Sequence, residues 1–131
     1  MKSPVRKCEA ADRQAALAHF EARLSFETDC WDVDYSIRND LIDFVLLDVR
    51  SPELYEKGHV PTAINLPTNA IDVETLPPLK PDTIYVVYCA GPHCNGANKA
   101  AIRIARLGYP VKEMIGGAIG WLDEGFELVT D

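Results

Sequence analysis

Residues 84–97 read IYVVYCAGPHCNGA and carry the strongest indications of both fold and chemistry. The run from Ile84 to Tyr88 is apolar on both faces, which is typical of a buried strand in a parallel sheet. A loop follows at residues 90–96, and then a helix is predicted from about Ala97 to Leu107, with Gly108 as its end. Strand, loop and helix in this order predict one repeating unit of an α/β sheet.

Other segments extend this alternation of strands and helices. Residues 44–47 form a second run that is apolar on both faces, and short strands are predicted at residues 63–66 and 111–115. Residues 30–37 alternate Trp31, Val33, Tyr35 and Ile37 with polar residues. This period of two predicts a half-exposed strand near a sheet edge.

The predicted helices are mostly short. Ser51-Pro52-Glu53 has the capping serine and early proline of a helix start, and Gly58 ends that helix. One or two helical turns are expected at residues 69–76, and a final short helix at 118–125. In residues 9–24 the apolar residues recur with the period of a helix, which places Leu17, Phe20 and Leu24 on one face. We expect this first helix to pack on the domain as an appendage.

These elements together predict an open, mostly parallel α/β sheet with helices on both faces, plus an N-terminal helix. Residues 1–28 are predicted as a helical extension, and residues 29–131 as the α/β domain. In such sheets the functional site lies beyond the carboxyl ends of the strands. Two predicted strand ends carry reactive or charged side chains: Asp48 with Arg50, and Cys89.

Composition excludes several classes of function. A chain of 131 residues supports one domain, and its thirteen basic against twenty acidic residues give a net charge of −7. No local basic patch stands out, so neither nucleic acid nor an anionic membrane is an expected partner. No apolar run approaches the roughly 20 residues of a membrane span, and no secretory leader is evident. A cytoplasmic location is therefore expected.

Cys89 is the best candidate for a reactive group. The loop's N–H groups and the positive end of the following helix point back toward this sulfur, which should favour the thiolate and lower the Cys89 pKa. The same arrangement would hold an anion or a charged, modified sulfur. The competing interpretation is a buried cysteine that acts as a small apolar residue. The loop residues that would form this site are Ala90, Gly91, His93, Cys94, Asn95 and Gly96.

Several motifs together resemble the rhodanese-like family. Residues 47–55 (LDVRSPELY) and 58–67 (GHVPTAINLP) are similar to its signature stretch. Residues 86–89, the alanine-rich helix after them, and residues 111–117 with Trp121 match the rest of the pattern. The similarity covers about residues 30–129 and excludes the first helix.

This resemblance implies a rhodanese-like domain with sulfurtransferase activity. Cys89 would attack a sulfane sulfur, become a persulfide and pass the sulfur to a thiol or another nucleophilic acceptor. No metal or organic cofactor is implied. The partners would be a small sulfur donor or a persulfide-carrying protein.

The loop departs from the family pattern in its charge. Many active members hold an anionic donor such as thiosulfate with an Arg or Lys in the loop, and none lies here between Cys89 and Lys99. His93 is the only loop side chain that can become cationic. Asn95 stands where phosphatases of the same fold place the arginine that clamps phosphate, so phosphatase activity is disfavoured. Poor use of thiosulfate is expected.

Alternatives remain open for the residues around Cys89. Cys94 is either a second reactive thiol or a small loop residue facing the protein. A metal site from Cys89, His93 and Cys94 lacks a fourth ligand, so none is predicted. Asp48 and Arg50 are expected to support the framework by hydrogen bonds. The alternative functions are a catalytically silent module that binds a protein partner, and a redox protein that cycles a Cys89–Cys94 disulfide.

Overall fold

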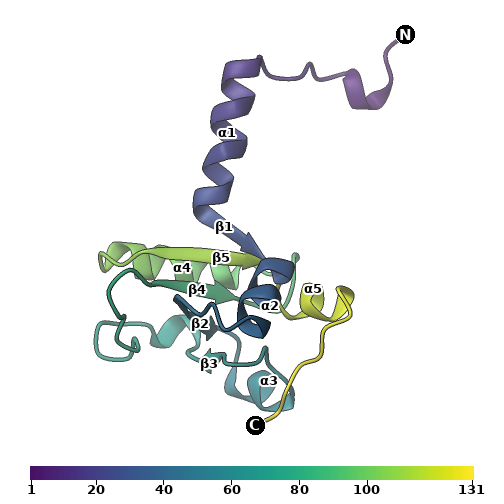
Figure 1. The fold of residues 1–131 in the computed structure, drawn as a ribbon. Coiled ribbons are helices and arrows are strands. Elements are labelled where there is room, and N and C mark those ends of the chain that lie inside the picture. The colour runs from purple at the N-terminus through teal and green to yellow at the C-terminus, as the bar shows by residue number, and fades with distance from the viewer.

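Five strands form a single, entirely parallel sheet in a computed structural model that describes all 131 residues (Figure 1). The strands lie in the order β1-β5-β4-β2-β3, so β4 is central and β1 lies at one edge. Their bounds are β1 Glu27–Asp29, β2 Phe44–Asp48, β3 Ile64–Asn65, β4 Ile84–Tyr88 and β5 Val111–Ile115. This arrangement confirms the predicted open α/β sheet.

Helices cover both faces of the sheet, as predicted. They are α1 Arg13–Phe26, α2 Cys30–Arg38, α3 Pro52–Lys57, α4 Gly96–Arg106 and α5 Gly117–Asp123, with short 3₁₀ turns η1 Pro4–Arg6 and η2 Thr68–Ala70. One core cluster packs α4 against the sheet, and a second packs α2 and α5 against the opposite face. No helix has both the length and the apolar character needed to cross a membrane.

The two central strands divide their side chains between these two cores. Leu47 and Val87 pack on the side of α4, whereas Leu46 and Val86 pack on the side of α2 and α5. Successive side chains of a strand point to opposite faces, so a strand covered on both sides must be apolar throughout. The continuous apolar runs in β2 and β4 therefore reflect burial on both faces.

Residues 30–37 form a helix, so the strand predicted there is wrong. The Asp29 carboxylate accepts a hydrogen bond from the Asp32 N–H and caps α2 at its start. Cys30, Val33 and Asp34 are buried and Ile37 is half-buried, which is helical spacing, whereas Trp31 and Tyr35 are exposed. The alternation of large apolar residues suggested a strand because two of them lie on the solvent side. The edge strand lies just before this segment, in β1.

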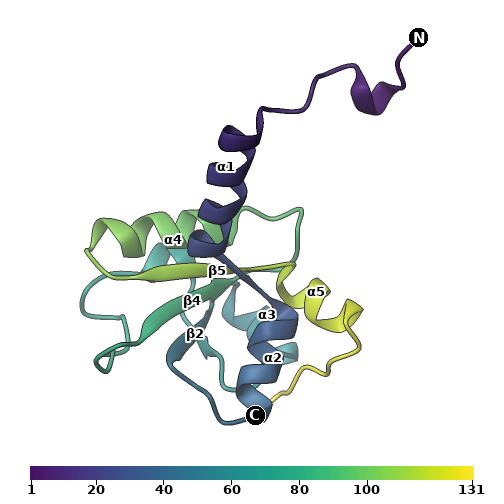
Figure 2. The same ribbon diagram turned by 45° about the horizontal axis from the view of Figure 1, so that its top comes forward.

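The N-terminal helix is present but does not pack on the domain as expected. Leu17, Phe20 and Leu24 are 61%, 59% and 72% exposed, and α1 contains no buried residue. Figures 1 and 2 both show α1 rising away from the sheet. The chain passes from α1 directly into β1 at Glu27, so no loop allows the helix to fold back. The predicted division after residue 28 falls within β1 and stays a prediction.

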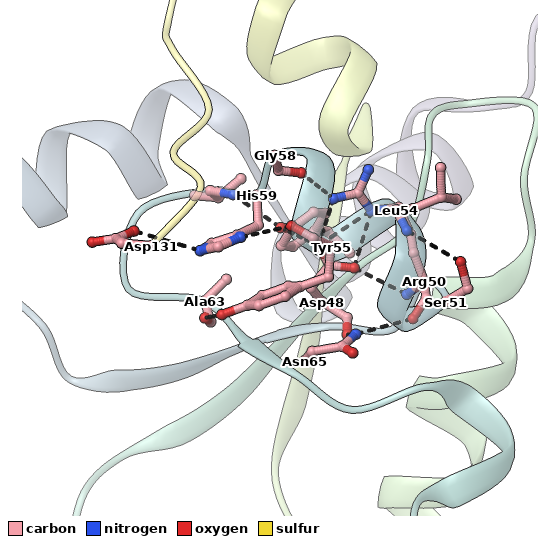
Figure 3. A network of polar contacts seen from close by, with 12 residues as sticks. Asp48, Arg50, Ser51, Leu54, Tyr55, Gly58, His59, Ala63, Asn65 and Asp131 are labelled. Atoms are coloured by element: carbon pink, nitrogen blue, oxygen red, sulfur yellow. Dashed lines mark hydrogen bonds and ion pairs between the residues drawn. The ribbon is translucent and has the colours of Figure 1, made fainter.

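A buried ion pair ties the strand ends together beneath the carboxyl edge of the sheet (Figure 3). The Asp48 carboxylate is fully buried and accepts hydrogen bonds from the Arg50 backbone N–H at 3.0 Å and from Arg50 Nη2 at 2.7 Å. The Tyr88 hydroxyl donates to the same carboxylate at 2.6 Å. Arg50 Nη2 also donates to the Gly58 carbonyl oxygen at 2.6 Å. The pair thereby joins β2, β4 and the end of α3.

Further hydrogen bonds extend this network to β3 and to the turn after α3. Asn65 Nδ2 donates to the backbone oxygens of Asp48 and Arg50, each at 3.0 Å. His59 is buried, stacks on the Tyr55 ring at 3.7 Å and contacts the Tyr55 carbonyl oxygen through Nδ1 at 2.8 Å. These contacts fix the positions of residues within the stretches 47–55 and 58–67, which carry part of the family resemblance.

The Asp48→Asn variant tests how much this network contributes to the free energy of unfolding. It keeps the shape of the side chain but leaves the Arg50 guanidinium without its buried counter-charge. We expect a loss of about 3 kcal/mol or more in the free energy of unfolding, measured by urea denaturation. Glu9→Gln, which alters an ion pair exposed at both ends, is the control and should leave stability unchanged. Equal stability of the two variants would contradict the assigned role.

Candidate active site

Cys89 lies at the carboxyl end of the central strand β4, on the wall of a pocket of about 250 Å³. Its side chain is 8% exposed, and Cys94 is half-buried beside it. The pocket is bounded by β1, β5, the loop after β4 and the first turn of α4. Its lining residues are Glu27, Cys89, Gly91, Pro92, Cys94, Ala97, Asn98, Glu113, Met114, Ile115, Gly116 and Gly117.

The first turn of α5 holds the start of the Cys89 loop in place. The Ala118 N–H donates to the Cys89 carbonyl oxygen at 3.0 Å, and the Ile119 N–H donates to the Ala90 carbonyl oxygen at 2.9 Å. The far end is held from η2, where the Thr68 hydroxyl donates to the Gly96 carbonyl oxygen at 3.1 Å. The N–H groups of Ala90 and Gly96 lie close enough to the Cys89 sulfur to favour its thiolate by hydrogen bonding.

At two positions of this site, neighbouring atoms lie so close to the backbone that only glycine fits. A Cβ atom at Gly96 would lie 2.8 Å from Cys89 Sγ, which would push the sulfur away from the helix start. A Cβ atom at Gly117 would lie 2.4 Å from the Cys89 carbonyl oxygen, and Gly117 also has a φ of +60°. These positions need glycine to let the loop contact both helices.

The sulfur atoms of Cys89 and Cys94 are in direct contact. Sγ of one lies 2.6 Å from Sγ of the other, and both residues are free thiols. The Gly96 N–H lies 3.5 Å from Cys94 Sγ and donates to it. The structure therefore brings together two cysteines for which the sequence left both a reactive and a passive interpretation of Cys94 open.

The two thiols of this pair ionise differently, contrary to the expectation of a lowered Cys89 pKa. Burial, followed by the hydrogen bond with Cys94, raises the pKa of Cys89 to about 11 despite the Ala90 and Gly96 N–H groups. The hydrogen bond from Cys89 and that from the Gly96 N–H lower the Cys94 pKa, and the Lys99 charge contributes. The hydrogen bond within the pair and the deeper burial of Cys89 therefore favour the negative charge on Cys94.

The remaining cysteines are remote from this chemistry. Cys30 is buried against α5, where its thiol donates to the backbone oxygens of Ile115 and Gly117. Burial, with nearby carboxylates, raises the Cys30 pKa to about 11. Cys8 is exposed near the N-terminus. Only Cys89 and Cys94 share a pocket.

Some of the other predicted loop residues line the pocket, and others do not. Gly91 is buried and lines the pocket, and Ala90 is half-buried at the loop's start. His93 and Asn95 are exposed and do not line the pocket, although Asn95 immediately precedes α4. No group of three His, Cys, Asp or Glu side chains lies close enough to hold a metal ion. Asp48 and Arg50 lie in the supporting network rather than in the pocket.

The pocket wall is acidic, a feature that the sequence analysis missed. Glu27 from β1 and Glu113 from β5 line it, and no Lys or Arg does. Asn98 Nδ2 donates to Glu113 Oε2 at 3.1 Å. Burial, followed by the Glu27 charge, raises the Glu113 pKa. The two carboxylates come from strands that pair only in the folded sheet, so no local sequence pattern indicated them.

A local basic patch is present on the opposite side of α4, although none was expected. Lys99, Arg103 and Arg106 lie along a groove of about 750 Å³ that no acidic residue lines. Their spacing of four and three residues places them on one helix face. Net charge sums over the whole chain, so the acidic total gave no indication of this clustering.

The thiol pair can be tested by alkylation at a series of pH values, read peptide by peptide by mass spectrometry. We expect Cys94 to reach its half-maximal rate at a lower pH than Cys89. In Cys94→Ser the midpoint of Cys89 should fall, because the thiol and charge that raise its pKa are lost. Cys30 is the internal control and should titrate near its raised pKa in both proteins. A wild-type Cys89 that titrates below Cys94 would contradict this order.

Comparison with known proteins places these features in a family. The model of the rhodanese-like domain matches residues 33–124. A sulfurtransferase of Allochromatium vinosum is 30% identical over 94 residues, which cover 70% of this chain and 83% of that protein. An HTH-type transcriptional regulator of Mycobacterium tuberculosis is 38% identical over 95 residues, covering 67% of this chain. The chain spans only 41% of the regulator's length.

A solved structure of a Bacillus halodurans protein supports the same assignment. It is 40% identical in sequence, has a TM-score of 0.85, and the match covers 90% of this chain and 86% of that one. The family match spans well over half of the chain and includes β2 to β5, the Cys89 loop and α5. This protein is therefore a member of the rhodanese-like domain family.

Proposed function

We propose that this protein is a sulfurtransferase that carries a sulfane sulfur as a persulfide on Cys89. The observation that carries the proposal is the placement of the Cys89 sulfur in a pocket, with the Ala90 and Gly96 N–H groups facing it. The family match and the similarity to a sulfurtransferase of Allochromatium vinosum support it. An inert, purely structural cysteine would need neither the pocket nor the N–H groups.

The first half-reaction loads the sulfur onto Cys89. The Cys89 thiol gives its proton to the Cys94 thiolate across the 2.6 Å contact and attacks the sulfane sulfur of the donor. A new bond forms between Cys89 Sγ and the sulfane sulfur. The bond from the sulfane sulfur to the rest of the donor breaks, and its electron pair leaves with the rest of the donor. With thiosulfate as donor, the leaving group is sulfite. This is nucleophilic catalysis by an activated thiol and uses no metal or organic cofactor.

The second half-reaction returns the sulfur to an acceptor. A thiolate or another nucleophile attacks the outer sulfur of the persulfide, and Cys89 leaves as a thiolate. The Ala90 and Gly96 N–H groups stabilise the negative charge at this site in both the persulfide and the released thiolate. The same groups therefore serve loading and transfer.

The acidic residues on the pocket wall should repel anionic sulfur donors. A dianionic donor must pass Glu27 and Glu113, and no cation lines the pocket to offset their charge. A neutral small persulfide, or a persulfide presented by a protein, avoids this repulsion. A reducing compartment such as the cytoplasm suits the proposal, because all four cysteines are free thiols.

The Cys89→Ser variant tests the identity of the nucleophile. We expect it to release no sulfite from thiosulfate and to gain no sulfur atom by mass spectrometry, because a hydroxyl cannot form a persulfide. Cys8→Ser changes an exposed thiol outside the pocket and should behave as the wild type. If the wild type also takes up no sulfur from thiosulfate or an organic persulfide, a silent binding module is the better interpretation.

The Glu113→Gln variant tests the effect of the acidic wall on thiosulfate. Loss of one negative charge should lower the KM for thiosulfate by about threefold to tenfold at low salt and leave kcat little changed, since the charge acts on approach. The gain should shrink as ionic strength rises. Glu21→Gln, on the exposed surface of α1, removes the same charge far from the pocket and is the control. Equal KM values in the two variants would exclude local repulsion.

A further inference from the structure

We propose that Cys94 is a second catalytic residue, which resolves the Cys89 persulfide by forming a Cys89–Cys94 disulfide and releases the carried sulfur as sulfide. The inference rests on the proposed loading of Cys89 and adds an outcome that ordinary sulfur transfer lacks. It gives the protein a sulfide-releasing activity that needs no external acceptor for the sulfur. It also explains why Cys94 lies in contact with the proposed nucleophile Cys89.

The positions of the two sulfur atoms carry this proposal. Cys94 Sγ lies 2.6 Å from Cys89 Sγ, so the two sulfur atoms are already in direct contact and can approach to the disulfide bond length of about 2.05 Å. The contact is with the inner sulfur of the future persulfide, which is the atom that must be attacked to displace the outer one. A hydrogen bond from the Cys94 N–H to the Gly91 carbonyl oxygen, at 3.0 Å, holds the loop in this turn. No large movement is needed to join the two sulfurs.

The charge on Cys94 suits an attacking group. The Gly96 N–H lies 3.5 Å from Cys94 Sγ, and the Lys99 charge acts on the same atom. In the unloaded protein the hydrogen bond from the Cys89 thiol and that from the Gly96 N–H lower the Cys94 pKa, with a smaller effect of Lys99, and favour the thiolate. After loading, the proton that Cys94 took from Cys89 passes to the outer sulfur of the persulfide. Cys94 is then again a thiolate, and the outer sulfur is ready to leave as HS⁻.

The step balances in atoms and electrons. The Cys94 thiolate donates an electron pair to Cys89 Sγ, and the bond from Cys89 Sγ to the outer sulfur breaks. That electron pair leaves with the outer sulfur and its proton as HS⁻. The sulfane sulfur is reduced to sulfide, while the two cysteines are oxidised to a disulfide. No other oxidant takes part.

A dithiol reductant completes the cycle. One of its thiolates attacks the Cys94 sulfur, which is the more exposed member of the pair, and Cys89 leaves as a thiolate stabilised by the Ala90 and Gly96 N–H groups. Its second thiolate then displaces Cys94. The protein returns to two thiols, and the reductant becomes a disulfide.

The test follows the fate of the sulfur after loading, in the absence of any reductant. Reduced wild-type protein, Cys94→Ser and Cys8→Ser are each loaded anaerobically with thiosulfate in closed vessels until sulfite release stops, and the sulfide released in that time is measured before small molecules are removed. Released sulfide and the mass of the intact chain are followed over time, and peptide mapping locates the sulfur or the disulfide. Sulfite reports the loading step, whereas sulfide reports resolution.

We expect the wild type and Cys8→Ser to release about one sulfide per chain and to end two hydrogen atoms lighter than the reduced protein, with Cys89 and Cys94 joined. Cys94→Ser should hold its extra sulfur on Cys89 and release sulfide at least about tenfold more slowly.

Other results separate this inference from the function on which it rests. A wild type that releases sulfite and then keeps the sulfur as long as Cys94→Ser does would overturn the resolving role, while sulfur transfer would stand. Movement of the extra sulfur to Cys94 without sulfide release would overturn the resolving role as well. If no protein released sulfite or gained sulfur from either thiosulfate or an organic persulfide, the proposed function and this inference would fall together.

Discussion

The position of the candidate active site depends on the hydrogen bonds of the buried Asp48 carboxylate. This carboxylate is fully buried, and it holds the Arg50 guanidinium on one side and the Tyr88 hydroxyl on the other. Tyr88 immediately precedes Cys89, so this carboxylate fixes the strand end from which the reactive loop departs. A buried carboxylate is tolerated because four hydrogen bonds from Arg50 and one from Tyr88 satisfy it.

The site also depends on a balance between burial and hydrogen bonding at two sulfur atoms. Burial disfavours charge on Cys89, while its N–H neighbours favour it, and contact with Cys94 lets the pair share one negative charge. A single buried thiol would have to ionise alone. In our proposal, the adjacent thiol accepts the proton during loading and discharges the sulfur afterwards. We also propose that Glu27 and Glu113, which line the pocket from outside the loop, disfavour anionic donors.

The sequence predicted the features that depend on local pattern. The runs of β2 and β4, the capped start of α3 at Ser51 and the loop around Cys89 were recognisable because each has its own period or turn residues. The α2 segment was mistaken for a strand because exposed Trp31 and Tyr35 imitate a period of two. The sulfur–sulfur contact, the acidic wall and the groove of Lys99, Arg103 and Arg106 depend on distances between elements, which composition and spacing do not encode.

In the function proposed here, the loop holds an accepted sulfur on Cys89 by its own N–H groups. A crystal structure of the Cys94→Ser variant loaded with a sulfur donor tests this claim most directly, because the variant cannot discharge the sulfur through a disulfide. We expect one additional sulfur atom bonded to Cys89 Sγ, inside the pocket and within hydrogen-bond distance of loop N–H groups. A loaded protein with no added atom on Cys89, or with the sulfur on another cysteine, would contradict it.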